Sequence, residues 1–152
     1  MVMRCGYRLL IGVMALGLVS GLTLTAPTTS VDAASAPTYD QSVGVLQLYV
    51  KYLNAKKYRD AYNLRGTSLQ RRQSYSSFAA GFSRTTQNTL RVSGTTAVGA
   101  QTVVRCQLSA ALASGSWQTF RGSYTIGREN GRFRIVSANL TVFGGPLVEP
   151  PG

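Results

Sequence analysis

In the second half of the chain, apolar and polar residues alternate, which is the pattern of β-strands that bury one face. The clearest example is residues 116–140, where two alternating segments meet at Asn130 and Gly131. An Asn-Gly pair favours a two-residue type I′ turn because both residues tolerate positive φ. A turn there places Glu129 opposite Arg132 and predicts a β-hairpin. The same register pairs Ile126 with Ile135, Arg128 with Phe133, and Thr125 with Val136.

The two faces of this predicted hairpin differ in character. Side chains of a strand point alternately to opposite faces, so residues two apart lie together. One face collects the apolar residues Phe120, Tyr124, Ile126, Phe133 and Ile135. The other face collects Arg121, Arg132 and Arg134. We expect the first face to be buried in the core and the second to face solvent.

Two further strands are expected ahead of the hairpin. Residues 89–94 alternate, and residues 94–99 are small and polar enough for a turn or a bulge. Residues 101–113 form a long alternating segment, and residues 114–116 form the turn that leads into the hairpin. The sequence therefore predicts four antiparallel strands joined in order.

Before residue 86, apolar residues recur at the 3.6-residue period of helices. Helical segments are expected over residues 40–54, 58–64, 67–73 and 74–84. Asp40 is expected at the start of the first helix, and Gly66 is expected as a left-handed C-terminal cap of the second. Helices followed by an antiparallel meander predict an α+β domain over residues 40–143, in which the N-terminal helices pack on one face of a curved four-stranded sheet.

The first 33 residues have the three-part layout of a secretory signal peptide. Arg4 and Arg8 precede an apolar run over residues 9–19, and a small-residue stretch ends in "VDAASAP", so cleavage is expected within residues 33–36. An uncleaved membrane anchor is the alternative, because the apolar region is almost long enough to span a bilayer. We expect a secreted protein without stable membrane insertion after cleavage. The mature chain would begin with a flexible lead-in and end in a frayed tail rich in glycine and proline, at residues 34–39 and 144–152.

The chain is strongly basic. It has 16 Lys and Arg residues against 5 Asp and Glu, a formal net charge of +11. Loss of Arg4, Arg8 and Asp32 with the signal peptide leaves 14 basic residues against 4 acidic ones. Such an excess speeds association with anionic partners, although net charge also serves solubility alone.

The order of these segments resembles the NTF2-like superfamily of cone-shaped, cystatin-like α+β domains. The resemblance is carried by "LQLYVKYLNAKKYRDAYNL", "SYSSFAAGFSRT" and the closing "YTIGRENGRFRIVSA", and it covers residues 39–142. The chain looks most similar to small secreted bacterial members. The resemblance implies a helix-covered cone whose uses range over isomerases, dehydratases, ligand binders and assembly modules.

The residue inventory argues against catalysis and against a metal or other cofactor. The sequence has no histidine. The acids of the mature chain are scattered at Asp40, Asp60, Glu129 and Glu149, and Asp60 is the strongest of them because the resemblance places the second helix at the cone mouth. Cys5 would leave with the signal peptide, so Cys106 would be the single cysteine of the mature chain. It lies on the apolar strand face, and we expect a buried structural thiol. We therefore predict no catalytic residue, no metal site and no cofactor.

Two sets of residues are candidate binding sites. The first is an anion-binding face of four arginines with the parity to project together, namely Arg91, Arg105, Arg121 and Arg134. The planar guanidinium can bind carboxylate, phosphate or sulfate through two hydrogen bonds at once. An anionic polymer, such as a cell-wall polymer or extracellular nucleic acid, or an acidic protein is the expected partner. The alternative is an ordinary solvated face, or one buried by homodimerisation through the sheet, as the resemblance allows.

The second candidate is the interior of the cone. Its expected lining is aromatic and comprises Tyr49, Tyr62, Phe78, Phe82, Tyr124 and Phe133. Tyrosines of this kind can line a pocket for a small apolar ligand, or they can fill the core with their hydroxyls at its rim. The predicted function is a secreted, non-catalytic binding or accessory domain that uses the arginine face. Binding of a small molecule in the cone is the alternative, with isomerase- or dehydratase-type catalysis there as the weaker form of it.

Overall fold

The computed structural model describes residues 35–143. Four helices come first, namely α1 (Tyr39–Asn54), α2 (Tyr58–Asn63), α3 (Thr67–Arg72) and α4 (Tyr75–Gly81). Four strands follow, namely β1 (Thr85–Val98), β2 (Gln101–Leu112), β3 (Trp117–Glu129) and β4 (Arg132–Val142). The α+β class and the order of helices before an antiparallel sheet are confirmed. The predicted signal peptide and tail lie outside the described residues.

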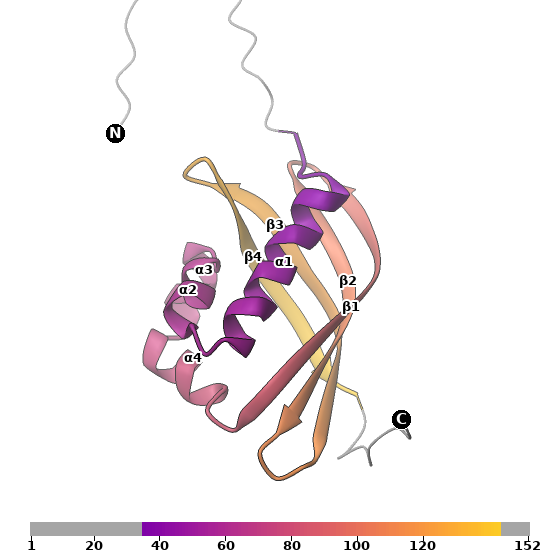
Figure 1. The fold of residues 1–152 in the computed structure, drawn as a ribbon. Coiled ribbons are helices and arrows are strands. Elements are labelled where there is room, and N and C mark those ends of the chain that lie inside the picture. Colours follow the sequence, from indigo (N-terminus) through magenta and orange to yellow (C-terminus); the bar gives the residue numbers. More distant parts are fainter. Residues whose placement is uncertain (1–34, 144–152) are drawn as a thin grey trace, which may run out of the picture. The chain divides into compact units, whose positions relative to one another are not determined.

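The sheet is a meander in the order β1-β2-β3-β4, with every neighbouring pair antiparallel. The strands twist and bend, and α1 lies along one face (Figure 1). We call the face toward the helices the inner face and the opposite one the outer face. The core lies between the inner face and the helices and comprises Leu46, Tyr49, Leu53, Ala61, Leu69, Phe78, Val104, Cys106, Tyr124, Ile126 and Ile135.

Helix α1 begins with a capping box. The Thr38 side chain accepts a hydrogen bond from the Gln41 backbone, and the Gln41 side chain accepts one from the Thr38 backbone. Asp40 lies in the first turn, where a carboxylate interacts favourably with the helix dipole, but the capping residue is Thr38. The buried hydroxyl of Thr102 in β2 donates to the Pro37 carbonyl at 2.6 Å and ties this end of α1 to the sheet.

The β3–β4 hairpin confirms most of the predicted register. Asn130 and Gly131 have φ values of 50° and 74°, as a type I′ turn requires. The pairs observed as predicted are Glu129 with Arg132, Arg128 with Phe133 and Ile126 with Ile135. The prediction for Thr125 is wrong, because it pairs with Ser137 and not with Val136. A bulge adds one residue to β4 at this point and shifts every later pair by one.

Both edges of the sheet are partly paired. At the β1 edge, the Asn54 side-chain amide donates to the Asn88 carbonyl at 3.0 Å, and the Asn88 backbone N–H donates to Asn54 Oδ1 at 2.7 Å. At the β4 edge, the Ile135 N–H donates to the Leu64 carbonyl and the Gly66 N–H donates to the Ile135 carbonyl, at 2.9 and 2.8 Å. The segment between α2 and α3 therefore runs beside β4.

Some of the predicted helix ends and strand boundaries are wrong. Gly66 has a φ of −70° and precedes α3 as its N-cap, so it is not a left-handed C-terminal cap of α2. Its backbone is held extended by the pairing with β4. Strand β1 begins at Thr85 and not near residue 89. Its register shift lies between Val92 and Gly94, residues 94–98 continue the strand in place of the predicted turn, and the turn comes at Gly99.

Candidate functional site

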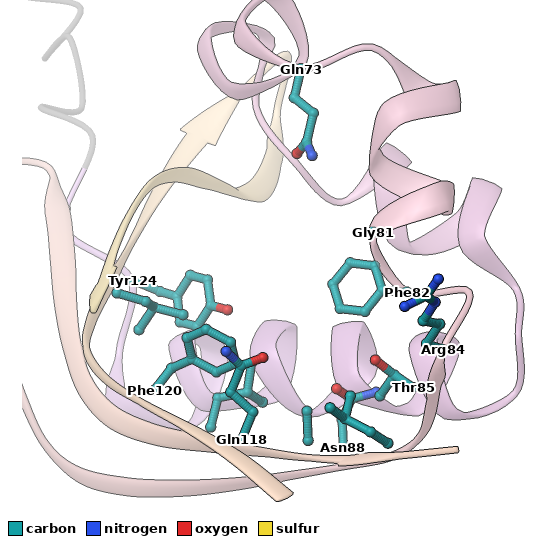
Figure 2. Close-up of a pocket in the computed structure, with 13 residues that line it drawn as sticks. Gln73, Gly81, Phe82, Arg84, Thr85, Asn88, Gln118, Phe120 and Tyr124 are labelled. Carbon is teal, nitrogen blue, oxygen red and sulfur yellow. The ribbon is translucent and has the colours of Figure 1, made fainter. Parts of the chain in front are cut away.

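A cavity of about 730 Å³ lies between the inner face and the segment that contains α4. Its wall on the helical side comes from Gln73, Gly81, Phe82 and Arg84. The remaining lining comes from all four strands, namely Thr85, Asn88, Leu108, Ala110, Leu112, Gln118, Phe120, Tyr124 and Leu140. Figure 2 shows these side chains around the opening.

The lining combines apolar walls with a few polar groups. The phenyl ring of Phe82 stands on one side of the cavity, and the hydroxyl of Tyr124 points into it from the other side (Figure 2). Phe82 is fixed from behind by the rings of Phe78 and Tyr58, with centroids 5.1 and 6.4 Å away. The Gln73 side chain reaches toward the cavity from the segment before α4 (Figure 2).

Two buried polar side chains, Tyr124 and Asn88, provide hydrogen-bonding groups on the inner wall of the cavity. Tyr124 is buried, and burial raises the pKa of its phenol well above the ordinary value. The phenol therefore stays neutral and can donate a hydrogen bond. Asn88 is also buried; its Nδ2 donates to Asn54 Oδ1, while its own Oδ1 has no hydrogen-bond partner among the described residues.

The six aromatic residues predicted to line the cone divide into two groups. Phe82 and Tyr124 line the cavity. The other four, Tyr49, Tyr62, Phe78 and Phe133, do not contribute to that lining. Tyr49 and Phe78 are core residues, with their ring centroids 6.3 Å apart. These two therefore fill the core, which was the alternative for this set.

Tyr62 and Phe133 contact polar groups. The Tyr62 hydroxyl donates to the backbone carbonyls of Gln70 and Gln73, at 3.1 and 2.9 Å. The Phe133 ring is covered by the guanidinium of Arg128, whose Cζ lies 4.7 Å from the ring centroid. Tyr62 thus connects α2 with α3 and the residue that follows it, whereas the Phe133–Arg128 contact lies within the β3–β4 hairpin.

Several lining residues were not predicted. The period-2 pattern of β2 does place Leu108 and Ala110 on the inner face, so this part of the lining had a sequence signal. Asn88 and Gln118 had no such signal in the sequence, because polar residues in strands usually face solvent. Their positions depend on where α4 leaves the sheet uncovered.

The outer face brings together three of the four predicted arginines. Arg91, Arg105 and Arg121 line a shallow hollow of about 410 Å³ together with Gln107 and the backbone around Gly122. Arg134 does not line this hollow. Its guanidinium instead hydrogen-bonds to the backbone carbonyl of Asn63 in α2, because the α2–α3 segment runs beside its strand.

The three acidic residues within residues 35–143 do not line either hollow, and Glu149 lies outside the described residues. Asp40 and Asp60 lie in α1 and α2. Glu129 caps α3, because its Oε2 accepts from the Thr67 N–H at 2.9 Å and from the Thr67 hydroxyl at 3.2 Å. Among residues 35–143, no group of three or more potential ligands is placed to hold a metal ion.

Cys106 is confirmed as a buried free thiol. Burial raises the pKa of the Cys106 thiol to about 11, so the group is protonated at neutral pH. A protonated thiol is a poor nucleophile. None of the helices in the described range is both long and apolar enough to cross a membrane.

Comparisons of the chain with protein-family models, with curated proteins and with solved structures gave no match. The cavity and the outer face are therefore the two features from which a function can be inferred.

Proposed function

We propose that this chain is a non-catalytic binding domain that holds a small amphipathic molecule in the cavity on the inner face. The observation that carries the proposal is a cavity of about 730 Å³ with apolar walls and a buried phenol that points into it. Pockets for small molecules and cofactors typically have volumes of roughly 300–1,000 Å³ and combine apolar walls with a few polar groups. The size and the lining both fit that range.

The lining suggests the chemistry of the ligand. An apolar body would contact Phe82, Leu108 and Phe120, which face the cavity from three elements. A neutral Tyr124 phenol would donate a hydrogen bond to an oxygen of the ligand. Arg84 lies at the exposed end of the lining and would attract an anionic group. We therefore propose an apolar acid, with an aromatic or aliphatic body and one carboxylate or sulfonate.

Binding without catalysis is supported by the composition of the cavity. Its lining contains no Asp, Glu, His or Cys. A general base must reach a substrate proton at hydrogen-bond distance, and no side chain of this lining is suited to that role. The order of helices before the sheet also supports the resemblance to NTF2-like domains, and the proposed setting is outside the cell, as the pattern of residues 1–33 suggests.

The test uses two fluorescent probes of similar size. One is 1-anilinonaphthalene-8-sulfonate, which carries the proposed anionic group, and the other is the neutral N-phenyl-1-naphthylamine. Ala110 lies on the inner face and in the lining, so Ala110→Phe fills the cavity with a ring. Ala111 is the next residue on the same strand and faces outward, so Ala111→Phe is the matched control.

We expect the purified protein to bind the sulfonate probe in one saturable site. The Ala110→Phe variant should lose about tenfold or more in affinity, because the ring occupies the space of the ligand, and Ala111→Phe should bind like the parent protein. Far-UV circular dichroism and melting curves of both variants check that they remain folded. Equal loss in both variants, or no saturable binding at all, would overturn the proposal.

A further inference from the structure

The three arginines of the outer face share one region of the sheet. Gln107 in β2 pairs with Arg91 in β1 and with Arg121 in β3, so these three side chains stand side by side across three strands. Arg105 is two residues before Gln107 and therefore projects from the same face. It pairs with Gly94, just beyond the register shift of β1. The register alone thus places three guanidinium groups around one hollow.

One of the three arginines, Arg121, is held in place by its neighbours. The Arg121 Nε donates to Gln107 Oε1 at 3.2 Å, and its Cζ lies 3.5 Å from the centroid of the Phe143 ring. The Arg105 guanidinium lies over Gly94, with Nη2 3.1 Å from the position that a Cβ would take there. A side chain at that position would push the guanidinium away. Less side-chain freedom is lost when the restrained Arg121 binds an anion.

The positive charges of the hollow have no acidic side chain among the residues that line it. Glu129 is engaged with α3, and the two other acids of residues 35–143 lie in the helices. Three neighbouring cations on one face repel each other unless an anion lies between them. The net charge of the chain extends the same positive field beyond the hollow. The arrangement therefore favours a ligand with several negative charges.

The chemistry of the hollow favours oxyanions over nucleobases. The guanidinium fork matches the oxygens of phosphate and sulfate groups, and the Gln107 amide adds a further polar contact. Proteins that bind single-stranded nucleic acid usually offer aromatic rings on which bases stack. The Phe143 ring beside the hollow is already covered by Arg121. None of the residues that line the hollow is aromatic, so the hollow offers contacts to charged groups and not to bases.

We propose that the outer face binds a linear polyanion through its repeated phosphate or sulfate groups, with Arg91, Arg105 and Arg121 as the contacting residues. Neighbouring strands are about 4.8 Å apart, so Arg91 and Arg121, two strands apart, begin roughly 10 Å from each other. A row of that length suits successive charged groups of one chain better than a single small ion. This site lies on the face opposite the cavity and is independent of the small-molecule proposal.

The experiment compares inorganic polyphosphate, pyrophosphate and a single-stranded oligonucleotide as probes of the purified full chain, with the polyphosphate and the oligonucleotide matched in total charge. One variant combines Arg91→Gln, Arg105→Gln and Arg121→Gln. A matched control removes three exposed positive charges from the helical side through Lys51→Gln, Arg71→Gln and Arg72→Gln. Affinity is measured over a series of salt concentrations, with light scattering to determine the oligomeric state.

We expect polyphosphate to bind the parent protein and the control with affinities within about threefold of each other. The outer-face variant should lose about tenfold or more, because charge-assisted hydrogen bonds from arginine are removed. Its dependence of log affinity on log salt should become less steep by about three units, one for each arginine that is replaced. An equal loss of polyphosphate affinity in the two triple variants would mean that binding depends on net charge alone, and it would overturn the proposed site.

Three other outcomes would also contradict the proposal. Pyrophosphate binding as tight as polyphosphate would assign the hollow to a small anion, and much tighter oligonucleotide binding would assign it to nucleic acid. A dimer that does not bind polyphosphate would mean that the outer face is a subunit interface.

A variant with Arg91→Lys, Arg105→Lys and Arg121→Lys adds a test in a protein of unchanged charge. Lysine lacks the planar guanidinium, so the affinity for polyphosphate should still fall several-fold. Unchanged affinity would contradict a role for the paired hydrogen bonds that arginine makes.

Discussion

The sharpest stability prediction concerns Gly122, at the centre of β3. Its φ is 153°, and a Cβ at this position would overlap the Asn139 carbonyl oxygen and stand 3.0 Å from the Leu140 Cα. Both neighbours are backbone atoms of β4, so no side chain can rotate away. The Gly122→Ala variant must therefore separate β3 from β4 locally or change the conformation of β3.

The expected loss of stability follows from two contributions. A non-glycine residue in a rarely populated backbone region costs about 1–3 kcal/mol. Forcing an extra carbon into a packed region costs about 1–3 kcal/mol more. The sum, about 2–6 kcal/mol, is a large part of the roughly 5–15 kcal/mol by which small domains are stable. At about 4 °C for each kcal/mol, the melting temperature should fall by roughly 8–24 °C.

The assay is thermal and urea unfolding followed by circular dichroism, with Gly44→Ala as the control. Gly44 lies within α1, and a Cβ there would meet no atom within 4 Å. Alanine is the better helix former, so this variant should gain about 0.5–1 kcal/mol. A Gly122→Ala protein that melts within a few degrees of the parent would refute the reasoning, because the close approach of β3 and β4 would then be unnecessary.

Three further predictions concern the cavity, a helix start and the thiol. Arg84→Gln should weaken the sulfonate probe several-fold and leave the neutral probe unchanged in fluorescence titrations; equal effects on both probes would exclude a charge contact. Glu129→Ala should lower the unfolding free energy by about 1–2 kcal/mol in urea titrations, because the Thr67 N–H loses its acceptor, whereas an unchanged free energy would mean that the cap is not formed in solution. Burial raises the pKa of the Cys106 thiol from 9.0 to about 11, so the neutral thiol is favoured in the folded state. This contribution to stability is complete below pH 9 and is lost as the pH rises toward 11. Alkylation by iodoacetamide at about pH 8 should therefore be slow in the folded protein and fast in urea, and equal rates would show that the thiol is accessible.

The parts of the fold that depend on neighbouring residues in the sequence could be predicted. The Asn130–Gly131 turn sets the register of the hairpin because a two-residue loop allows one pairing, and the Ile126–Ile135 pair follows from it. The bulge at Val136 could not be predicted from this local signal. It coincides with the point where β4 also pairs with the α2–α3 segment, a contact between residues distant in the sequence.

The same limit applies to the candidate sites. The alternation of side chains along a strand predicted that Arg91, Arg105 and Arg121 lie on one face. The register of β1, β2 and β3 brings these three residues together there. Arg134 has the right parity, but the α2–α3 segment runs beside its strand and brings the Asn63 carbonyl within reach of its guanidinium. Periodicity also could not separate Tyr49 of α1, which fills the core, from Tyr124 of β3, which packs in the core and also lines the cavity.

The pairing of both sheet edges has a consequence for behaviour at high concentration. Open edge strands can add a strand from another molecule, which is a route to fibrils and aggregates. Here the Asn54 amide occupies backbone groups of β1 at Asn88, and residues 64–66 occupy those of β4 at Ile135. A second copy of the chain cannot extend the sheet at these positions without displacing a native contact. We therefore expect heat-induced aggregation to begin with the detachment of the end of α1 or of the α2–α3 segment, before the sheet itself unfolds.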